Sequence, residues 1–215
     1  MAPATYRTFG RLVLWGTFVR VKRSDMRRVG KELGTNLPED YRRFIEVANG
    51  GVLPYAVDLP PGAADAEPIE FSHLHTITPG RSGDFSWGTV LGEKRHLHGA
   101  HLAEILPSDV VPIASDGSGS SLYVRLHPDH FGEVWAFVHG LPEWAGGNEQ
   151  DRGGVVAPSF DAFLEMLYIH DESAEMQWRD AQGADEWLGV VELWLDAGLP
   201  DWRSRPWAAG ASKQS

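Results

Sequence analysis

Across residues 37–51 the apolar positions of the segment LPEDYRRFIEVANGG recur at spacings of three and four. This spacing places them on one face of an α-helix. Pro38 suits the first turn of a helix, and Glu39 and Asp40 complement the positive end of the helix dipole. The Asn-Gly-Gly sequence at 49–51 tolerates the left-handed turn that ends a helix. The pattern predicts a core helix whose apolar face consists of Leu37, Tyr41, Phe44, Ile45 and Ala48.

The pattern changes to that of β-strands from Val110 onward. Residues 110–114 form a short apolar run, and residues 122–126 and 134–138 each alternate with a period of two. The connection at 128–132 is short enough for the last two runs to pair as antiparallel neighbours. We expect these three runs to form the centre of a sheet.

Capping residues and apolar stripes predict three further helices. Ser24 is a suitable N-cap for a helix that ends at Gly34. Ser159 is a suitable N-cap for a second helix, whose apolar face extends to Tyr168. A third helix carries apolar residues from 184 to 195 and ends at the Gly198 and Pro200 signals.

Three segments show no clear period. Residues 6–21 fit a strand or a short helix equally well. The proline-rich, acidic segment after Gly51 predicts a loop region with one or two edge strands, of which 69–74 is the best candidate. Residues 142–154 have the composition of a glycine-rich polar loop.

Composition narrows the classes of function. With 42% hydrophobic and 23% charged residues, the chain has the make-up of a soluble globular protein. The absence of cysteine excludes disulfides, thiolate metal sites and a cysteine nucleophile. A formal net charge of -11 argues against general binding to nucleic acid or to anionic membranes, and makes a basic protein the natural partner. The apolar run 9–21 is interrupted by arginines and too short to span a bilayer, so we expect a cytoplasmic protein.

The histidines and the glycine-rich turn are the candidate chemical sites. The pairs His73 with His75 and His96 with His98 could each place two imidazoles on one side of a strand, and His101 could join the second pair. No recognised metal motif accompanies them, so we expect neither a metal nor another cofactor. The segment 115–121 lacks the lysine of a P-loop, the spacing of a nucleophile elbow and the glutamate of a calcium loop. It predicts a tight turn in which Asp116 binds backbone donors.

Tryptophan is unusually frequent, with 9 in the chain, and five of these lie near the C-terminus. Helical spacing assigns Trp187 and Trp194 to an apolar core stripe. Trp178, Trp202 and Trp207 stay open as either core residues or anchors of an interface.

Three blocks of the sequence, taken in order, resemble the SUKH superfamily of the Smi/Knr type. The first is LPEDYRRF at 37–44 followed by Asn-Gly-Gly, and the second is ASDGSG at 114–119 with GEVW behind it at 132–135. The third is APSF at 157–160 and the helix that follows. The resemblance covers about residues 24–170. The insertion after Gly51 and the tryptophan-rich segment after Asp171 depart from the family pattern.

The resemblance implies an α+β fold with a mainly antiparallel sheet flanked by helices. It also implies a protein that is not an enzyme: bacterial members bind and neutralise a cognate toxin, often a nuclease, encoded beside them in polymorphic toxin systems. On this basis we expect one domain over residues 1–203 with a helical extension at about 171–203, and a disordered tail at 204–215.

For such a protein we expect acidic loops to meet a basic toxin and aromatic residues to anchor it, without nucleic acid or membrane as a partner. The predicted toxin-binding residues are Asp58, Asp65, Glu67, Glu70, Asp84, Trp87 and Trp135. Ordinary solvation explains the acids as well, and Trp135 fits equally a sheet face covered by a helix. Two other functions stay open, a regulatory scaffold of the fungal cell-wall regulator type and a metal-dependent hydrolase built on the histidine pairs.

Overall fold

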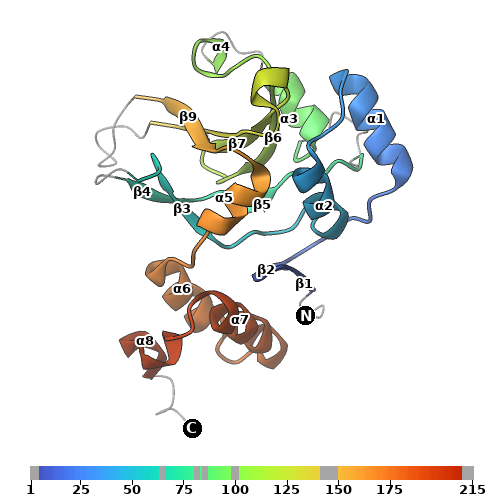
Figure 1. The fold of residues 1–215 in the computed structure, drawn as a ribbon. Coiled ribbons are helices and arrows are strands. Elements are labelled where there is room, and N and C mark those ends of the chain that lie inside the picture. The colour runs from blue at the N-terminus through green and yellow to red at the C-terminus, as the bar shows by residue number, and fades with distance from the viewer. Residues whose placement is uncertain are drawn as a thin grey trace.

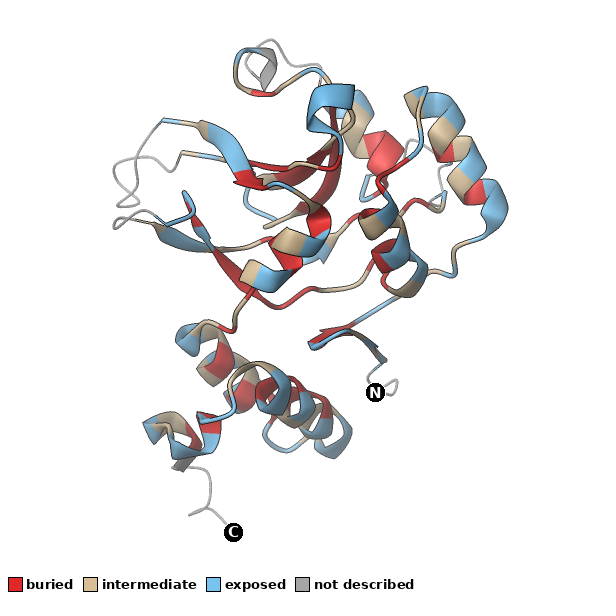
Figure 2. Cartoon of the chain, viewed as in Figure 1, coloured by how far each residue is buried: buried red, intermediate tan, exposed pale blue. Residues whose placement is uncertain are grey.

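The structure, a computed structural model, describes residues 5–62, 66–79, 83, 87–97, 102–140 and 150–209 (Figure 1). Helices and antiparallel sheets combine in an α+β fold, as predicted. The buried residues concentrate on the central strands and on the sides of the helices that face them (Figure 2). Within the described part of the chain, no helix has the length and apolar character needed to cross a membrane.

A five-stranded antiparallel sheet forms the centre of the molecule, with the order β5-β6-β7-β8-β9. Its strands are β5 (His73–Leu74), β6 (Val110–Ser115), β7 (Ser121–Arg125), β8 (Val134–Val138) and β9 (Arg152–Ala157). The three strands predicted from periodicity are β6, β7 and β8, and they hold the centre as expected. The prediction of a glycine-rich loop over 142–154 is wrong at its C-terminal end, because residues 152–154 belong to β9.

An N-terminal hairpin of β1 (Tyr6–Phe9) and β2 (Leu12–Trp15) resolves the ambiguity at 6–21 in favour of strands. Isolated bridges from Trp15 to Val52 and from Val52 to His73 attach this hairpin to the β5 edge of the central sheet. All four residues of β2 are buried, because both faces of the strand are covered.

A separate hairpin is formed by β3 (Ala56–Leu59) and β4 (Glu67–Glu70). The edge strand predicted at 69–74 is therefore divided between β4 and β5, with Phe71 and Ser72 between them. Ala56 also forms a bridge with Tyr168, through backbone hydrogen bonds of 2.8 and 3.0 Å. The hairpin is thus tied to the segment that follows α5.

Helices α1 (Arg23–Leu33), α2 (Glu39–Val47) and α5 (Phe160–Met166) lie beside the sheet. The prediction of α2 is confirmed, with Tyr41 and Phe44 fully buried. Helix α1 begins earlier than predicted: Lys22 is its N-cap in place of Ser24, and the Lys22 amide donates to Asp25 Oδ2 at 2.9 Å. Asp40 joins two helices, since its Oδ2 accepts from the amides of Phe160 and Asp161 at the start of α5.

The remaining helices are short, except for α6 and α7 in the C-terminal segment. Helices α3 (Val90–His96), α4 (Leu102–Ile105) and the 3-10 turn η1 (Pro128–His130) lie in the connections of the sheet. The C-terminal segment contains α6 (Asp171–Ala181), α7 (Asp185–Gly198), the 3-10 turn η3 (Trp202–Ser204) and α8 (Pro206–Ala209).

The C-terminal helices pack on the N-terminal hairpin. The ring of Trp15 in β2 makes edge contacts with Trp187 at 5.0 Å and Trp194 at 5.3 Å between centroids. Trp178 and Trp202 are buried, so the hypothesis that they anchor an interface is wrong, and Trp207 stacks on Trp202. The tail expected from Ser204 overlaps α8, and residues 210–215 lie outside the described residues.

Candidate functional site

The hairpin of β3 and β4 has one apolar side and one acidic side. Val57 and Ile69 face each other across the two strands, and Val57 is completely buried. Neighbouring side chains of a strand point to opposite faces, so Asp58 lies on the outer side and is exposed. Glu70, paired with Ala56 in the register, lies on the same outer side.

Tyr168 completes the outer side of the hairpin. Its hydroxyl donates a hydrogen bond of 2.5 Å to Asp58 Oδ1. Burial, together with the hydrogen bond to Asp58 and the negative charges of Asp58 and Glu70, raises the pKa of Tyr168 to about 12. One carboxylate oxygen of Glu70 is buried and has no hydrogen-bond partner among the described residues. We call Asp58, Glu70 and Tyr168 the acidic hairpin face.

Glu67 points to the other side of the hairpin and bridges to the sheet. Its Oε2 accepts from Arg152 of β9 at 2.8 Å. Behind this ion pair lies a cavity of about 230 Å³ between the hairpin and the last two strands. Its walls are apolar and comprise Leu59, Pro60, Pro61, Ala136, Val138 and residues 152–156. We call this cavity the hairpin groove.

Trp135, one of the predicted anchors, is only 6% exposed. It belongs to a small cluster with Leu106, Tyr123 and Phe137 on the face of the sheet opposite the main core. Its indole covers Gly153 of β9 so closely that a Cβ on Gly153 would lie 1.8 Å from Trp135 Cη2. Trp135 therefore fills a sheet face, as the alternative interpretation predicts, and has no surface to offer a partner.

Trp87, the other predicted anchor, is 72% exposed. Its ring stacks on His96 with a centroid distance of 4.0 Å, beside the last turn of α3, which also carries Lys94 and Arg95. Helix α3 lies on a different side of the sheet from the acidic hairpin (Figure 1). The structure thus places Asp58 and Glu70 on one side of the β3–β4 hairpin and Glu67 on the other, and it separates Trp87 from all three. Asp65 and Asp84 lie outside the described residues.

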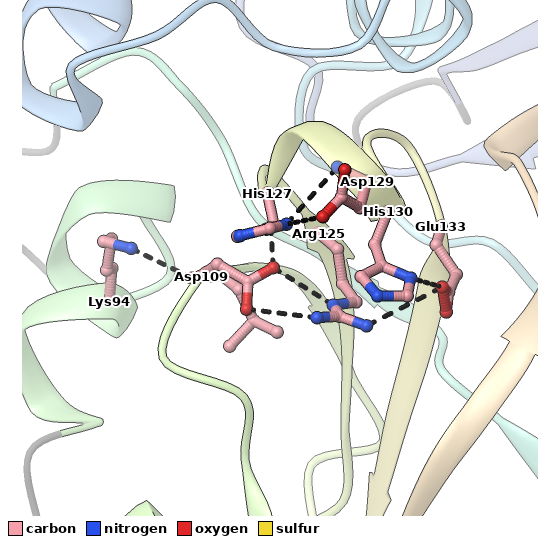
Figure 3. Close-up of polar contacts among 8 residues, drawn as sticks. Lys94, Asp109, Arg125, His127, Asp129, His130 and Glu133 are labelled. Atoms are coloured by element: carbon pink, nitrogen blue, oxygen red, sulfur yellow. Dashed lines mark hydrogen bonds and ion pairs between the residues drawn. The ribbon is translucent and has the colours of Figure 1, made fainter.

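A second polar cluster surrounds Arg125 at the end of β7 (Figure 3). Its guanidinium donates to both oxygens of Asp109, at 3.0 and 3.3 Å, and lies 3.7 Å from Glu133. Glu133 also contacts His130 at 3.0 Å, and Asp109 accepts from the amide of His127. Burial alone would raise the pKa of Asp109, but its bonds with Arg125 hold it below the ordinary value. Asp109 and Glu133 thus share Arg125 as a partner, and together with His127 and His130 they hold the turn between β7 and β8 in place.

The histidine pairs do not assemble a metal site in the described part of the chain, which holds no group of three or more potential ligands. His75 is buried, whereas His73 is exposed. His98 and His101 lie outside the described residues. The turn at 115–121 is as predicted: Asp116 Oδ1 accepts from the amides of Ser118, Gly119 and Ser120 at 2.8 to 3.1 Å.

Tyr168, Arg152 and the hairpin groove are absent from the predicted site. Periodicity places Tyr168 on the apolar face of a helix, but α5 ends at Met166 and Tyr168 pairs with β3. The two glycines that follow Arg152 indicate a loop, whereas the structure places all three residues in β9. The pair Val155 and Val156 directly after these glycines is the signal for a strand.

A family model described as the SMI1 / KNR4 family (SUKH-1) matches residues 20–166, which is more than half of the chain. The match includes α1, α2, the acidic hairpin and the central sheet through α5, and it leaves out the β1–β2 hairpin and the helices α6 to α8. No curated protein matches the sequence.

Proposed function

The chain belongs to the SMI1 / KNR4 family (SUKH-1), and from this we propose that it is a non-enzymatic immunity protein that binds a cognate toxin and blocks it by occlusion. The toxin is a basic protein, for example a nuclease, and the encounter takes place in the cytoplasm. The acidic hairpin face is the centre of the contact.

The observation that carries this proposal is the state of the carboxylates on the acidic hairpin face. Neither Asp58 nor Glu70 forms an ion pair with a cation of the described residues. Asp109 and Asp161, by contrast, are each paired with an arginine. Unpaired carboxylates held in place by a rigid hairpin attract a cationic surface without first breaking an internal ion pair.

The charge of the whole chain acts in the same direction. A formal net charge of -11 steers a basic partner toward this protein and speeds its association. A nuclease needs cations to hold the phosphates of its substrate, and an acidic face competes for the same cations. Occlusion of the substrate groove requires no chemistry from the immunity protein.

A growth assay tests the proposal. The candidate toxin encoded beside this gene is expressed with the wild-type chain, with Asp58→Asn/Glu70→Gln, or with the control Glu172→Gln/Glu186→Gln on α6 and α7. Both double variants remove the same charge. We expect the wild type and the control to protect growth, and the hairpin variant to lose protection while its thermal unfolding is unchanged.

Two outcomes would contradict the proposal in different ways. If the wild type neither binds nor neutralises a toxin encoded beside it, the protein is better explained as a regulatory scaffold of the same family. If the wild type protects and both double variants protect equally, the acidic hairpin face is not the contact.

A further inference from the structure

Strand β9 forms one edge of the central sheet, and the two edges differ. The edge at β5 is extended by Val52 and the β1–β2 hairpin, through the bridges described above. At the other edge, β9 pairs with β8 only, and no further strand follows it among the described residues. Gly153, Gly154 and Val155 of β9 are exposed. An exposed edge offers unpaired backbone groups to another strand.

The hairpin groove opens along one face of β9. Arg152, Gly154 and Val156 alternate with Gly153 and Val155, and the register pairs Gly154 with Ala136 on the face that lines the groove. No atom of the described residues lies within 4 Å of a Cβ built on Gly154, so they leave the groove open at this point of the strand. A side chain from a neighbouring strand could enter it here.

A second hollow with apolar residues in its lining lies at the opposite end of β9. Val155 is 50% exposed and Phe131, in the turn after η1, is 45% exposed, and both border an open hollow of about 490 Å³. Asp129 and Glu133 stand at its rim. Two apolar contact points therefore lie along one exposed strand: the groove, beside the Glu67–Arg152 ion pair, and the hollow, which Asp129 and Glu133 border.

We propose that β9 binds an extended segment of a cationic protein partner as an added antiparallel or parallel strand. An apolar side chain of that segment enters the hairpin groove beside Gly154, and a lysine or arginine flanking it meets Asp129 at the hollow. Backbone hydrogen bonds supply affinity in this mode and the alternate side chains supply specificity. The inference rests on the proposed function in taking the toxin as the natural source of this segment.

A second copy of the chain fits this edge less well. Pairing two β9 strands would bring two molecules of net charge -11 together. Like charges that face each other across an interface oppose association. A cationic strand has the opposite charge to the chain as a whole and to the carboxylates that border the hollow.

The variant Gly154→Leu tests the groove. The added side chain has open space, so we expect the fold and the thermal stability to be retained, while the groove mouth becomes filled. Gly189→Leu on α7 is the matched control, since a Cβ on this exposed glycine also has no neighbour within 4 Å. We expect Gly154→Leu to weaken binding of the toxin by about tenfold or more, and Gly189→Leu to leave the dissociation constant unchanged.

A synthetic probe separates the strand inference from the proposed function. A short peptide of alternating valine and lysine is added to the wild type, with a valine and glutamate peptide as its control, and amide shifts are followed by NMR. We expect the cationic peptide to shift the amides of residues 152–157 in the wild type but not in Gly154→Leu, and the anionic peptide to shift neither.

The inference is overturned if the cationic peptide leaves β9 unchanged or affects Gly154→Leu equally. It is also overturned if β9 amides respond to the concentration of the protein alone, which would identify a second copy as the occupant. A peptide result as expected, together with no binding of the neighbouring toxin, would refute the proposed function and leave the strand site standing.

Discussion

Gly153 and Gly154 are adjacent in β9, but their environments differ sharply. A Cβ on Gly153 would lie 1.8, 2.5 and 2.8 Å from three atoms of the Trp135 indole, whereas one on Gly154 would meet no atom within 4 Å in the part of the chain that the structure describes. Neither residue has a positive φ, so the difference arises from packing alone. We predict that Gly153→Ala destabilises the protein and that Gly154→Ala does not.

The magnitude follows from how firmly Trp135 is held. The clashing atoms are at the far end of the indole, but Tyr123, Phe137 and Leu106 surround the ring and restrict its movement. Forcing an extra carbon into a packed cluster costs typically about 1–3 kcal/mol. At Gly154 the loss of chain entropy in the unfolded state favours alanine, by about 0.4–1 kcal/mol.

Urea denaturation of the two variants and the wild type measures both effects as changes in midpoint at constant slope. A third variant, Trp135→Phe, removes the indole atoms that clash, so Gly153→Ala should cost clearly less in this background. The placement of Trp135 over β9 would be refuted by equal stability of Gly153→Ala and Gly154→Ala. It would also be refuted if Gly153→Ala cost the same in the wild type and in the Trp135→Phe background.

Three further predictions concern the scaffold. Asp40→Ala should lower the free energy of unfolding by about 1–2 kcal/mol, because it removes the acceptor of two amides at the start of α5. Asp40→Asn should lower it less, and urea denaturation measures both changes. Burial, and secondarily His73, lowers the pKa of His75 from 6.5 to about 4. Between pH 6.5 and pH 4 the unfolded state therefore binds more protons than the folded state. The free energy of unfolding should be highest above about pH 6.5 and fall by about 2–3 kcal/mol toward pH 4. In urea denaturation, His75→Phe should show a smaller fall of the midpoint over this range. Trp15→Ala should lower the free energy of unfolding by about 3–5 kcal/mol and make the α6–α8 segment sensitive to limited proteolysis, because the Trp15 ring packs on Trp187 and Trp194. Unchanged proteolysis would show that these helices dock without Trp15.

The elements that could be predicted from the sequence are those with a complete local signal. Helix α2 has a stripe, an acidic first turn and a glycine stop, and β7 and β8 have a period of two on a sheet with one face in the main core. Strand β2 could not be recognised, because its four residues Leu-Val-Leu-Trp are all apolar and show neither a period of two nor a helical period. Strand β9 is hidden by its glycines, which are compatible with a strand only because Trp135 fills the space above Gly153.

The candidate site was predictable only in part. The acidic character of the β3–β4 segment is visible in the sequence, and the structure places Asp58, Glu67 and Glu70 on one hairpin. The partners that define their roles, Tyr168 and Arg152, are distant in sequence and meet the hairpin only through the tertiary fold. Trp135 is predicted as an anchor from its residue type alone, but packing across the strands of the sheet buries its ring.

The central claim, neutralisation by occlusion through the acidic hairpin face, is tested most directly by the activity of the purified toxin encoded beside this gene. With one equivalent of the wild-type chain we predict that toxin activity on its substrate falls to background, and that Asp58→Asn/Glu70→Gln restores it. Full toxin activity in the presence of excess wild-type protein would contradict the account.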